Sequence, residues 1–226
     1  MSFSKSSLDF LFQNRINDSK PWFLEHKNEY NELVLKPLCE LVTALEPAVH
    51  EIDKYLICEP KVGRSVSRIY RDVRFSNDKS VFRDVMWCTF MRDKKLYHGV
   101  PAFFFEVSPV GFRYGCGYYQ ASVESMDAMR QLILDGDRDF LSAIKAFKKQ
   151  SVFHLEDVKY KRTKFPDQPD ELREWLDQKS VCLIANSGDF DMLFSDGLAK
   201  KLADDYRSIK PIYDFLMKSE SMVLKK

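Results

Sequence analysis

Two kinds of hydrophobic spacing alternate along this chain, and their order predicts helices on both sides of a group of strands. Apolar residues recur every three or four positions over 8–16 and again over 22–45, which is the spacing of amphipathic helices. Proline has no backbone N–H to donate inside a helix. We therefore expect a kink or break of the second helix at Pro37 and a restart of the chain at Pro47.

From residue 85 the pattern changes to short aromatic and β-branched runs. Three such runs, over 85–92, 101–109 and 111–119, are separated by charged residues, glycine or proline. Runs of this length and composition are typical of strands joined by turns. They predict a central antiparallel meander of three strands.

The rest of the chain returns to helical spacing, with two further strands. The period over 126–133 and 140–147 predicts two helices joined at Asp135-Gly136. The other elements expected in this part are a strand at 154–163, a short helix within 167–178, a buried strand at 180–186, and a helix over 193–209 that restarts at Pro211 and ends in a polar tail at 217–226. Together the patterns predict an α+β fold with N-terminal helices, a central antiparallel meander and further helices interleaved with strands. No repeat or long linker divides the chain, so we expect residues 1–226 to form a single domain.

Composition narrows the class of protein without naming a function. The chain has 226 residues, of which 45% are hydrophobic and 31% charged, with 18 Phe, 10 Tyr and 3 Trp, which is typical of a folded globule. Its formal net charge of +1 provides no overall field that would attract nucleic acid or acidic lipid. It has only eight glycines and neither of the common glycine-rich nucleotide motifs.

Cysteines, histidines and the longest apolar run indicate the compartment and the cofactor class. Five widely spaced cysteines with no CxxC pair are typical of reduced thiols in a cytoplasmic protein. The first twenty residues lack the apolar core of a secretory signal, and the run at 101–107 is too short for a membrane span, so we expect no membrane partner. No histidine or cysteine pair has the spacing of a zinc or iron site, and no cofactor is predicted. Aspartate and glutamate ligands for Mg²⁺ have no distinctive spacing in a sequence, so the sequence does not exclude a Mg²⁺ site.

One basic segment, 61–83, stands out from the otherwise slightly acidic chain. It holds seven basic and two acidic residues, a local charge of +5 that leaves −4 for the remaining chain. Such a concentration of positive charge suits a local site for an anion. Arginine matters most, because its planar fork forms bidentate bonds to carboxylate or phosphate. The candidate ligand-binding residues are Arg68, Arg71, Asp72, Arg74, Asp78, Lys79 and Arg83.

The local structure of the basic segment is ambiguous from its sequence. Val66, Ile69 and Val73 fit one stripe of a helix. Strand alternation instead places Ile69, Val73 and Phe75 on one face and the charged residues on the other. The strand interpretation is favoured, because it separates charge from apolar residues more completely. The turn-forming residues at 75–79 predict a loop after it.

Three functions are compatible with the basic segment. The first is a binding domain with a pocket for a phosphorylated metabolite, a nucleotide or another small anion. Arg68, Arg71, Arg74 and Lys79 would form this pocket. Nucleic acid is the less favoured ligand, because the acidic remainder of the chain would repel a long polyanion. The second function is that of a phosphoryl-transfer or phosphodiester-hydrolysing enzyme, in which Asp72 and Asp78 hold Mg²⁺. The third is that of a structural interaction module without chemistry, in which arginines and aspartates clamp the meander to the N-terminal helices.

The same segment resembles a known family. Residues 68–79 read Arg-Ile-Tyr-Arg-Asp-Val-Arg-Phe-Ser-Asn-Asp-Lys, which is similar to the signature of a widespread bacterial family, also found in fungi, that is classed as a domain of unknown function. Further matches, within a resemblance that spans most of 8–186, are Trp22-Phe23, Lys27, Tyr30, Pro37, the strand Gly115-x-Gly117, and Arg130 on the helix after it. Val81-Phe82-Arg83 stands where the family has Pro-Tyr-Lys, and 159–166 keeps only part of an Arg-x-Pro-Lys-Gly-Tyr pattern. The resemblance implies a fold and a shared polar site, and no activity.

Three other features each have a functional and an ordinary interpretation. Cys116 lies between two glycines and could be an exposed nucleophile, although glycine in an aromatic strand more often marks a bulge or tight packing. The basic residues at 159–164, with Tyr160 and Phe165, could extend a surface toward nucleic acid or form a solvated edge strand. The aromatic side chains at 22–30 could form the wall of a site or an ordinary core contact.

Overall fold

An antiparallel sheet of five strands lies at the centre of the structure, a computed structural model that describes residues 3–74, 77–97 and 99–224. The strands lie in the order β1-β2-β3-β5-β4. Their bounds are β1 (Met86–Phe90), β2 (Ala102–Ser108), β3 (Gly111–Gly117), β4 (His154–Leu155) and β5 (Cys182–Ser187). The predicted meander is confirmed, because β1, β2 and β3 pair in the order of the sequence. The predicted α+β fold class is confirmed with it.

Helices precede the sheet, follow its meander and close the chain. The predicted pair of helices around Asp135-Gly136 is confirmed as α5 and α6. The helical elements of the described residues are α1 (Lys5–Asn17), α2 (Lys20–Glu25), α3 (Lys27–Tyr30), the π-helical turn η1 (Asn31–Leu35), α4 (Lys36–Ile52), the 3-10 turn η2 (Lys94–Leu96), α5 (Val123–Leu134), α6 (Arg138–Lys149), α7 (Asp170–Leu176), α8 (Phe190–Leu193), α9 (Leu198–Ser208) and α10 (Lys210–Met222).

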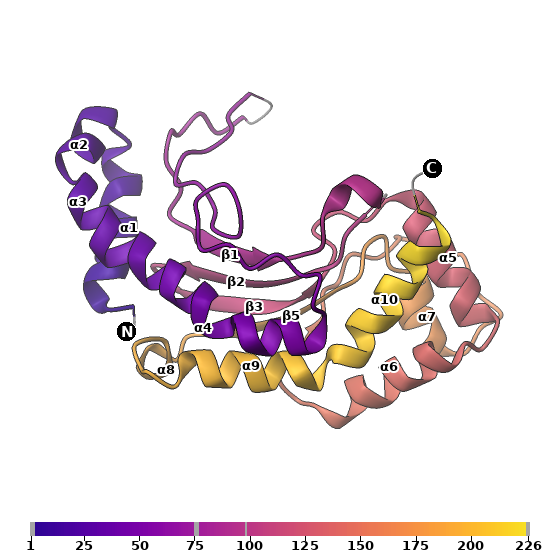
Figure 1. Cartoon of the computed structure of the whole chain (residues 1–226). Coiled ribbons are helices and arrows are strands. Elements are labelled where there is room, and N and C mark those ends of the chain that lie inside the picture. The colour runs from indigo at the N-terminus through magenta and orange to yellow at the C-terminus, as the bar shows by residue number, and fades with distance from the viewer. Residues whose placement is uncertain (1–2, 75–76, 98, 225–226) are drawn as a thin grey trace.

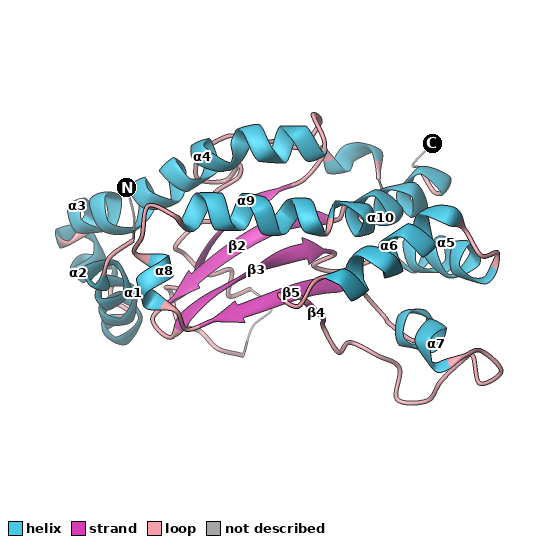
Figure 2. Cartoon of the chain, turned by 90° about the horizontal axis from the view of Figure 1, so that it is seen from below, coloured by secondary structure: helices cyan, strands magenta, loops and turns pink. Residues whose placement is uncertain are grey.

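Helices cover one face of the sheet and leave the other face more open. Helices α4 and α9 lie side by side under the sheet, and α10 continues from α9 (Figure 1, Figure 2). Because side chains alternate along a strand, Met86 of β1 is fully buried while Trp87 is only half-buried. On the covered face, the ring centroid of Phe103 lies 5.0 Å from that of Tyr206 and 5.1 Å from that of Tyr213. The segment that leads to β1 stands above the opposite face in Figure 1.

The two predicted proline effects have different outcomes. At Pro37 the helix is irregular but not broken, because the π-helical turn η1 leads directly into α4. A π-type turn is a local irregularity that lets a helix continue past a residue with no N–H to donate. The predicted restart at Pro47 is wrong, since α4 runs through it without interruption. The neighbouring side chains Leu45 and Val49 are fully buried in the core. Their burial outweighs the hydrogen bond that Pro47 cannot make.

Two other expectations are corrected by long-range contacts. The strand predicted at 154–163 ends at Leu155, because the chain then leaves the sheet, and Lys159 forms only an isolated bridge with Gln178. The polar tail predicted at 217–226 is wrong up to Met222, because α10 continues that far and packs against α5 and α6. Its polar residue Glu220 is fully buried.

Candidate functional site

The basic segment 61–83 has neither a helix nor a regular strand in its described residues, and after a tight turn at 61–66 it runs beside the edge of the sheet. The N–H of Ser67 donates to the carbonyl of Trp87 at 2.9 Å, and the N–H of Thr89 donates to the carbonyl of Ser65 at 2.8 Å. These two bonds attach the first half of the segment to β1. The hydroxyl of Ser67 also accepts a bond from the N–H of Trp87 at 3.0 Å. The backbone of Trp87 is therefore held through both its N–H and its carbonyl.

The second half of the basic segment is a long turn that closes on itself. Tyr70 pairs with Phe82 in an antiparallel bridge. The strand interpretation is therefore closer to the structure than the helix, although the pairing consists of isolated bridges. Phe75, which the predicted alternation included, and Ser76 lie outside the described residues. Within the predicted loop at 75–79, the three described residues have no helix or strand.

Aromatic packing holds this turn on the N-terminal helices. The ring centroid of Phe23 on α2 lies 5.6 Å from that of Tyr70, 5.0 Å from that of Phe82 and 5.4 Å from that of Tyr30. Phe23, Tyr30 and Phe82 are buried. The aromatic residues at 22–30 thus make an ordinary core contact through Phe23 and Tyr30, and that contact positions the charged residues next to Tyr70.

Asp78 gathers two arginines from distant parts of the chain. Nη2 of Arg71 lies 3.2 Å from Oδ2 of Asp78, and Nη2 of Arg15 on α1 lies 3.0 Å from the same oxygen. The N–H and hydroxyl of Ser80 donate to the other oxygen. The bonds from Ser80, followed by the charges of the two arginines, hold the pKa of Asp78 below its ordinary value. Among the described residues, the buried Nε of Arg71 has no hydrogen-bond partner.

Asp72 and Arg74 form a separate, exposed pair. Nε of Arg74 donates to Oδ1 of Asp72 at 2.9 Å, and Nη2 donates to Oδ2 at 2.6 Å. This bidentate bond lowers the pKa of Asp72 to about 2. Lys79 is exposed as well, and its Nζ donates to the carbonyl of Val73 at 3.1 Å. The forks of Arg74 and Arg71 therefore already engage carboxylates of the same segment.

Arg83 lies in a different environment from the other arginines of the segment. Its Cζ is 4.6 Å from the ring centroid of Trp87, and its Nε donates to the carbonyl of Tyr70 at 3.2 Å. Burial lowers the pKa of Arg83, and the positive charge of Arg71 lowers it further. Within the described ranges, Arg83 forms no ion pair with a carboxylate. A desolvated guanidinium beside a second positive charge is an arrangement that an anion would stabilise.

The seven candidate residues are thus divided into three groups. Arg71, Asp78 and Arg83 lie together beside the aromatic turn, whereas Asp72 and Arg74 pair with each other in solvent. Lys79 binds backbone, and Arg68 is exposed beside Gly63 with no ion-pair partner in the part of the chain that the structure describes. Sequence reasoning missed Arg15, Asp18 and Trp87, which the tertiary structure adds to the first group.

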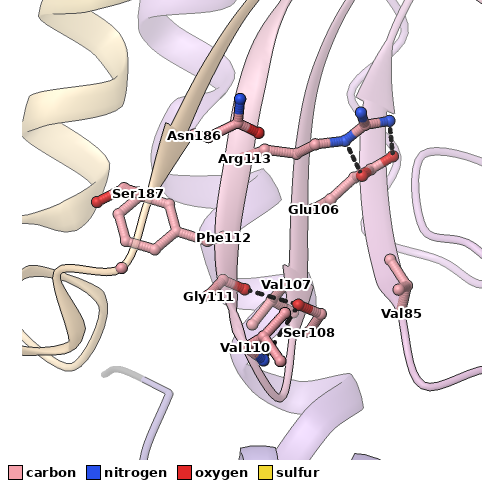
Figure 3. A pocket seen from close by; sticks show the side chains of 11 residues that line it. Val85, Glu106, Val107, Ser108, Val110, Gly111, Phe112, Arg113, Asn186 and Ser187 are labelled. Carbon is pink, nitrogen blue, oxygen red and sulfur yellow. Dashed lines mark hydrogen bonds and ion pairs between the residues drawn. The ribbon is translucent and has the colours of Figure 1, made fainter.

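A hollow on the sheet lies apart from these residues. It has a volume of about 480 Å³ and includes Glu106 on β2 and Arg113 on β3, which Figure 3 shows pointing toward one another. Arg113 binds Glu106 with two nitrogens, and its Nη1 lies 3.8 Å from Oε1 of Glu156. None of the seven candidate residues lines this hollow. In the sequence, this pair is indicated by one charged residue in each of two apolar strands that a short turn joins.

Thiol and metal chemistry receive no support from the described residues. Cys116 is fully buried on β3, and burial raises the pKa of its thiol well above the ordinary value. The interpretation of its flanking glycines as tight packing is confirmed, because a Cβ on Gly115 would overlap the carbonyl oxygen of Leu183 on β5. All five cysteines are free. In the described ranges, no three residues of the types His, Cys, Asp and Glu are grouped so that they could hold a metal ion.

Comparisons with known proteins place the chain in a family without describing an activity. The sequence profile of a family described as "Conserved hypothetical protein (DUF2461)" matches residues 6–215. No curated protein matches, and no solved structure matches. None of the described helices has both the length and the apolar character needed to cross a membrane.

Proposed function

The chain belongs to the DUF2461 family of conserved hypothetical proteins, and we propose that it is a binding domain whose Arg83 and Arg71 hold a small anion. The description of the family names no activity, so the proposal rests on the site itself. The observation that carries it is the guanidinium of Arg83, which lies over the ring of Trp87 beside the charge of Arg71. The charge of Asp72 also acts on Arg83, but no described carboxylate forms an ion pair with it. Phosphorylated metabolites and nucleotides are the ligand class with the matching charge.

The chemistry of the two arginines suits an oxyanion. A guanidinium offers parallel N–H donors to two oxygens of one phosphate or carboxylate. Among the described residues, Arg83 donates a hydrogen bond through its Nε alone, to the carbonyl of Tyr70, so its terminal nitrogens could bind a ligand. Arg71 keeps a buried Nε without a partner in the described ranges. An anion between the two arginines would offset their mutual repulsion and satisfy these donors.

Thermal shift with a panel of anions tests this function. Inorganic phosphate, pyrophosphate, nucleotides and sugar phosphates are added at constant ionic strength, and a ligand at a hundred times its Kd should stabilise the fold by about 2.7 kcal/mol. Arg83→Gln should weaken binding of the best ligand by about tenfold or more, because a charge-assisted hydrogen bond is lost. Arg83→Lys should restore only part of it, since lysine lacks the planar fork.

Arg64→Gln is the matched control, because it removes the same charge from an exposed arginine of the same segment that pairs with Glu59. We expect it to change the affinity less than threefold. Failure of every anion to shift the melting temperature, or equal losses in Arg64→Gln and Arg83→Gln, would contradict the proposal.

A structural clamp is the second candidate, and a specific group of contacts favours it. Asp78 binds Arg15 of α1 as well as Arg71, and Asp18 accepts bonds from the backbone of the turn. This function requires no ligand, so it alone would account for a protein that no anion stabilises. The Mg²⁺-dependent enzyme has less support, because Asp72 and Asp78 are each bonded to a different arginine.

A further inference from the structure

Three cations surround the ring of Tyr160, in the loop between β4 and α7. Nζ of Lys164 lies 3.9 Å from the ring centroid, Nζ of Lys179 lies 5.6 Å from it, and Cζ of Arg130 also lies 5.6 Å from it. A single cation is sufficient for a cation–π contact. Three like charges around one ring repel each other, so the group is more than a packing contact.

Backbone hydrogen bonds bring these side chains together. The N–H of Tyr160 donates to the carbonyl of Asp177 at 3.0 Å, and the N–H of Lys164 donates to Oδ1 of the same residue at 3.0 Å. The N–H of Lys179 donates to the carbonyl of Val158 at 2.7 Å. The loop that carries Tyr160 and Lys164 is therefore tied to the segment that follows α7.

Arg130 supplies a fixed positive charge beneath the cluster. It is only 7% exposed. Its Nε donates to the carbonyl of Leu176 at 3.0 Å, its Nη2 to the carbonyl of Gln178 at 2.7 Å, and its Nη1 to Asp127 at 2.8 Å. All of its nitrogens are thus engaged, so Arg130 acts on a ligand through its charge and through the segment that it holds in place.

The outer groups of the cluster, by contrast, keep their donors. Nζ of Lys164, Nζ of Lys179 and the hydroxyl of Tyr160 form no hydrogen bond or ion pair with any described residue. Two ammonium groups and one phenol offer seven N–H and O–H hydrogens as donors, and no described residue accepts a hydrogen bond from them. A ligand group with several oxygen atoms could accept hydrogen bonds from these three side chains.

We propose that Lys164, Lys179 and Tyr160 bind a phosphate group of a small ligand, at a site that does not depend on Arg83. Each ammonium would donate to one phosphate oxygen, and the tyrosine hydroxyl would donate to another. The guanidinium of Arg130, held 5.6 Å from the ring centroid and paired with Asp127, would add a weaker attraction for the bound dianion. Of the basic residues at 159–164, only Lys164 would bind this anion directly, together with Lys179 from the segment after α7.

The surroundings favour a small anion over a nucleic acid. A hollow of about 400 Å³ adjoins the cluster at Asp177, and acidic side chains predominate around it. Its lining residues are Lys159, Asp170, Glu171, Arg173, Glu174 and Asp177. A long polyanion that crossed the cluster would meet this acidic rim, whereas a single phosphate would not.

The test uses the Arg83→Gln protein, so that the two proposed anion sites are separated. Binding of inorganic phosphate is followed by its ³¹P chemical shift at constant ionic strength, and we expect Arg83→Gln to retain one phosphate site. Adding Lys164→Gln and Lys179→Gln should weaken this remaining binding about tenfold or more. Adding Lys161→Gln and Arg162→Gln instead is the matched control, because it removes two charges from exposed residues of the same loop that do not contact the ring.

The outcomes separate this inference from the proposed function. Equal weakening by the Lys164/Lys179 pair and by the control pair would overturn the Tyr160 site, and so would the absence of phosphate binding in Arg83→Gln. An unchanged affinity on going from wild type to Arg83→Gln would contradict only the Arg83 site. A short oligothymidylate that requires Lys164 and Lys179, together with no binding of inorganic phosphate, would overturn the small-anion site in favour of single-stranded nucleic acid.

Discussion

Oδ1 of Asp18 accepts a hydrogen bond from the N–H of Val81, 2.8 Å away and 63 residues later in the chain. The same oxygen accepts a second bond from the N–H of Phe82 at 3.0 Å. Asp18 also ends α1, where its own backbone is left-handed, with φ of 43°, and its N–H donates to the carbonyl of Asn14. One residue thus terminates the first helix and anchors the turn that carries Arg83.

Replacement of Asp18 should show how much its side-chain oxygen and its left-handed backbone contribute together to stability. Asp18→Ala removes the acceptor and places alanine in a left-handed conformation, so we expect a loss of about 2–3 kcal/mol in the free energy of unfolding, measured with urea. Asp18→Asn keeps a side-chain oxygen and tolerates this backbone, so its loss should stay below about 1 kcal/mol. Equal losses in the two variants would show that the bonds to the turn contribute little.

Loss of the Asp78 carboxylate should strengthen anion binding at Arg83. Asp78→Asn removes the charge that engages Arg71 and Arg15, so both arginines become available to a ligand. We expect the affinity for phosphate to rise about threefold to tenfold in the ³¹P titration. Asp204→Asn, on the helix-covered side of the sheet, makes the same change in net charge and should leave the affinity within twofold. Weaker binding in Asp78→Asn would mean that this carboxylate orders the site.

Glycine is required at position 115 by the approach of two strands. A Cβ on Gly115 would overlap the carbonyl oxygen of Leu183, and neither backbone can move without breaking the pairing of β3 with β5. Gly115→Ala should lower the free energy of unfolding by about 3 kcal/mol or more, or prevent folding. Gly188→Ala is the control, because no atom lies within 4 Å of its Cβ position. A mild effect of Gly115→Ala in urea denaturation would contradict this packing.

Asp53 should contribute to the acid sensitivity of the fold. Burial acts to raise its pKa, but hydrogen bonds from Arg92 and Tyr213 and from the N–H of Tyr55 hold the pKa below its ordinary value. The contribution is therefore present at neutral pH, above the pKa of the unfolded chain, and is lost as the pH falls through the lowered pKa of the folded state. Asp53→Asn should cost about 2 kcal/mol at pH 7. This difference from wild type should shrink below about pH 4 in urea denaturation, and a difference that does not vary with pH would contradict the role of the charge.

Loss of the carboxyl group of Glu220 should destabilise the fold. Its Oε1 accepts a bond from the hydroxyl of Tyr118 at 2.6 Å, and its Oε2 accepts one from the N–H of Gly99 at 3.1 Å. Glu220→Leu removes both acceptors from this fully buried position, so these two donors lose their partner. We expect a loss of about 2–3 kcal/mol. Ser221→Ala, on the exposed side of the same helix, should change the stability by less than about 0.5 kcal/mol.

The elements that the sequence predicted well are those in which one local pattern persists. The meander is an example, because each of its three strands is a short aromatic and β-branched run bounded by charged residues, glycine or proline. The pair α5 and α6 is another, because Gly136 adopts a φ of 67° and separates two clear helical periods. In both cases the residues that decide the structure are neighbours in the chain.

The predictions that failed concern residues whose partners are distant in sequence. Pro47 does not interrupt α4, because burial of its neighbours against the core outweighs a local rule. The composition of the C-terminal segment suggested a tail, but Tyr118 lies 102 positions from Glu220 and makes that polar residue part of the core. A pattern within ten residues cannot reveal such a partner.

The candidate site divides in the same way. The positive charge of 61–83 can be located from the sequence, because its arginines lie close together in the chain. The partner of each arginine depends on the tertiary packing. Both oxygens of Asp72 bind Arg74, and Arg71 pairs with Asp78 through one nitrogen, whereas Arg83 lies over Trp87 and forms no ion pair with a described carboxylate. Whether a carboxylate neutralises a guanidinium depends on distances that are set by the packing of α1, the turn and β1. These distances cannot be predicted from the sequence, because the arginines are of one residue type and have similar spacing.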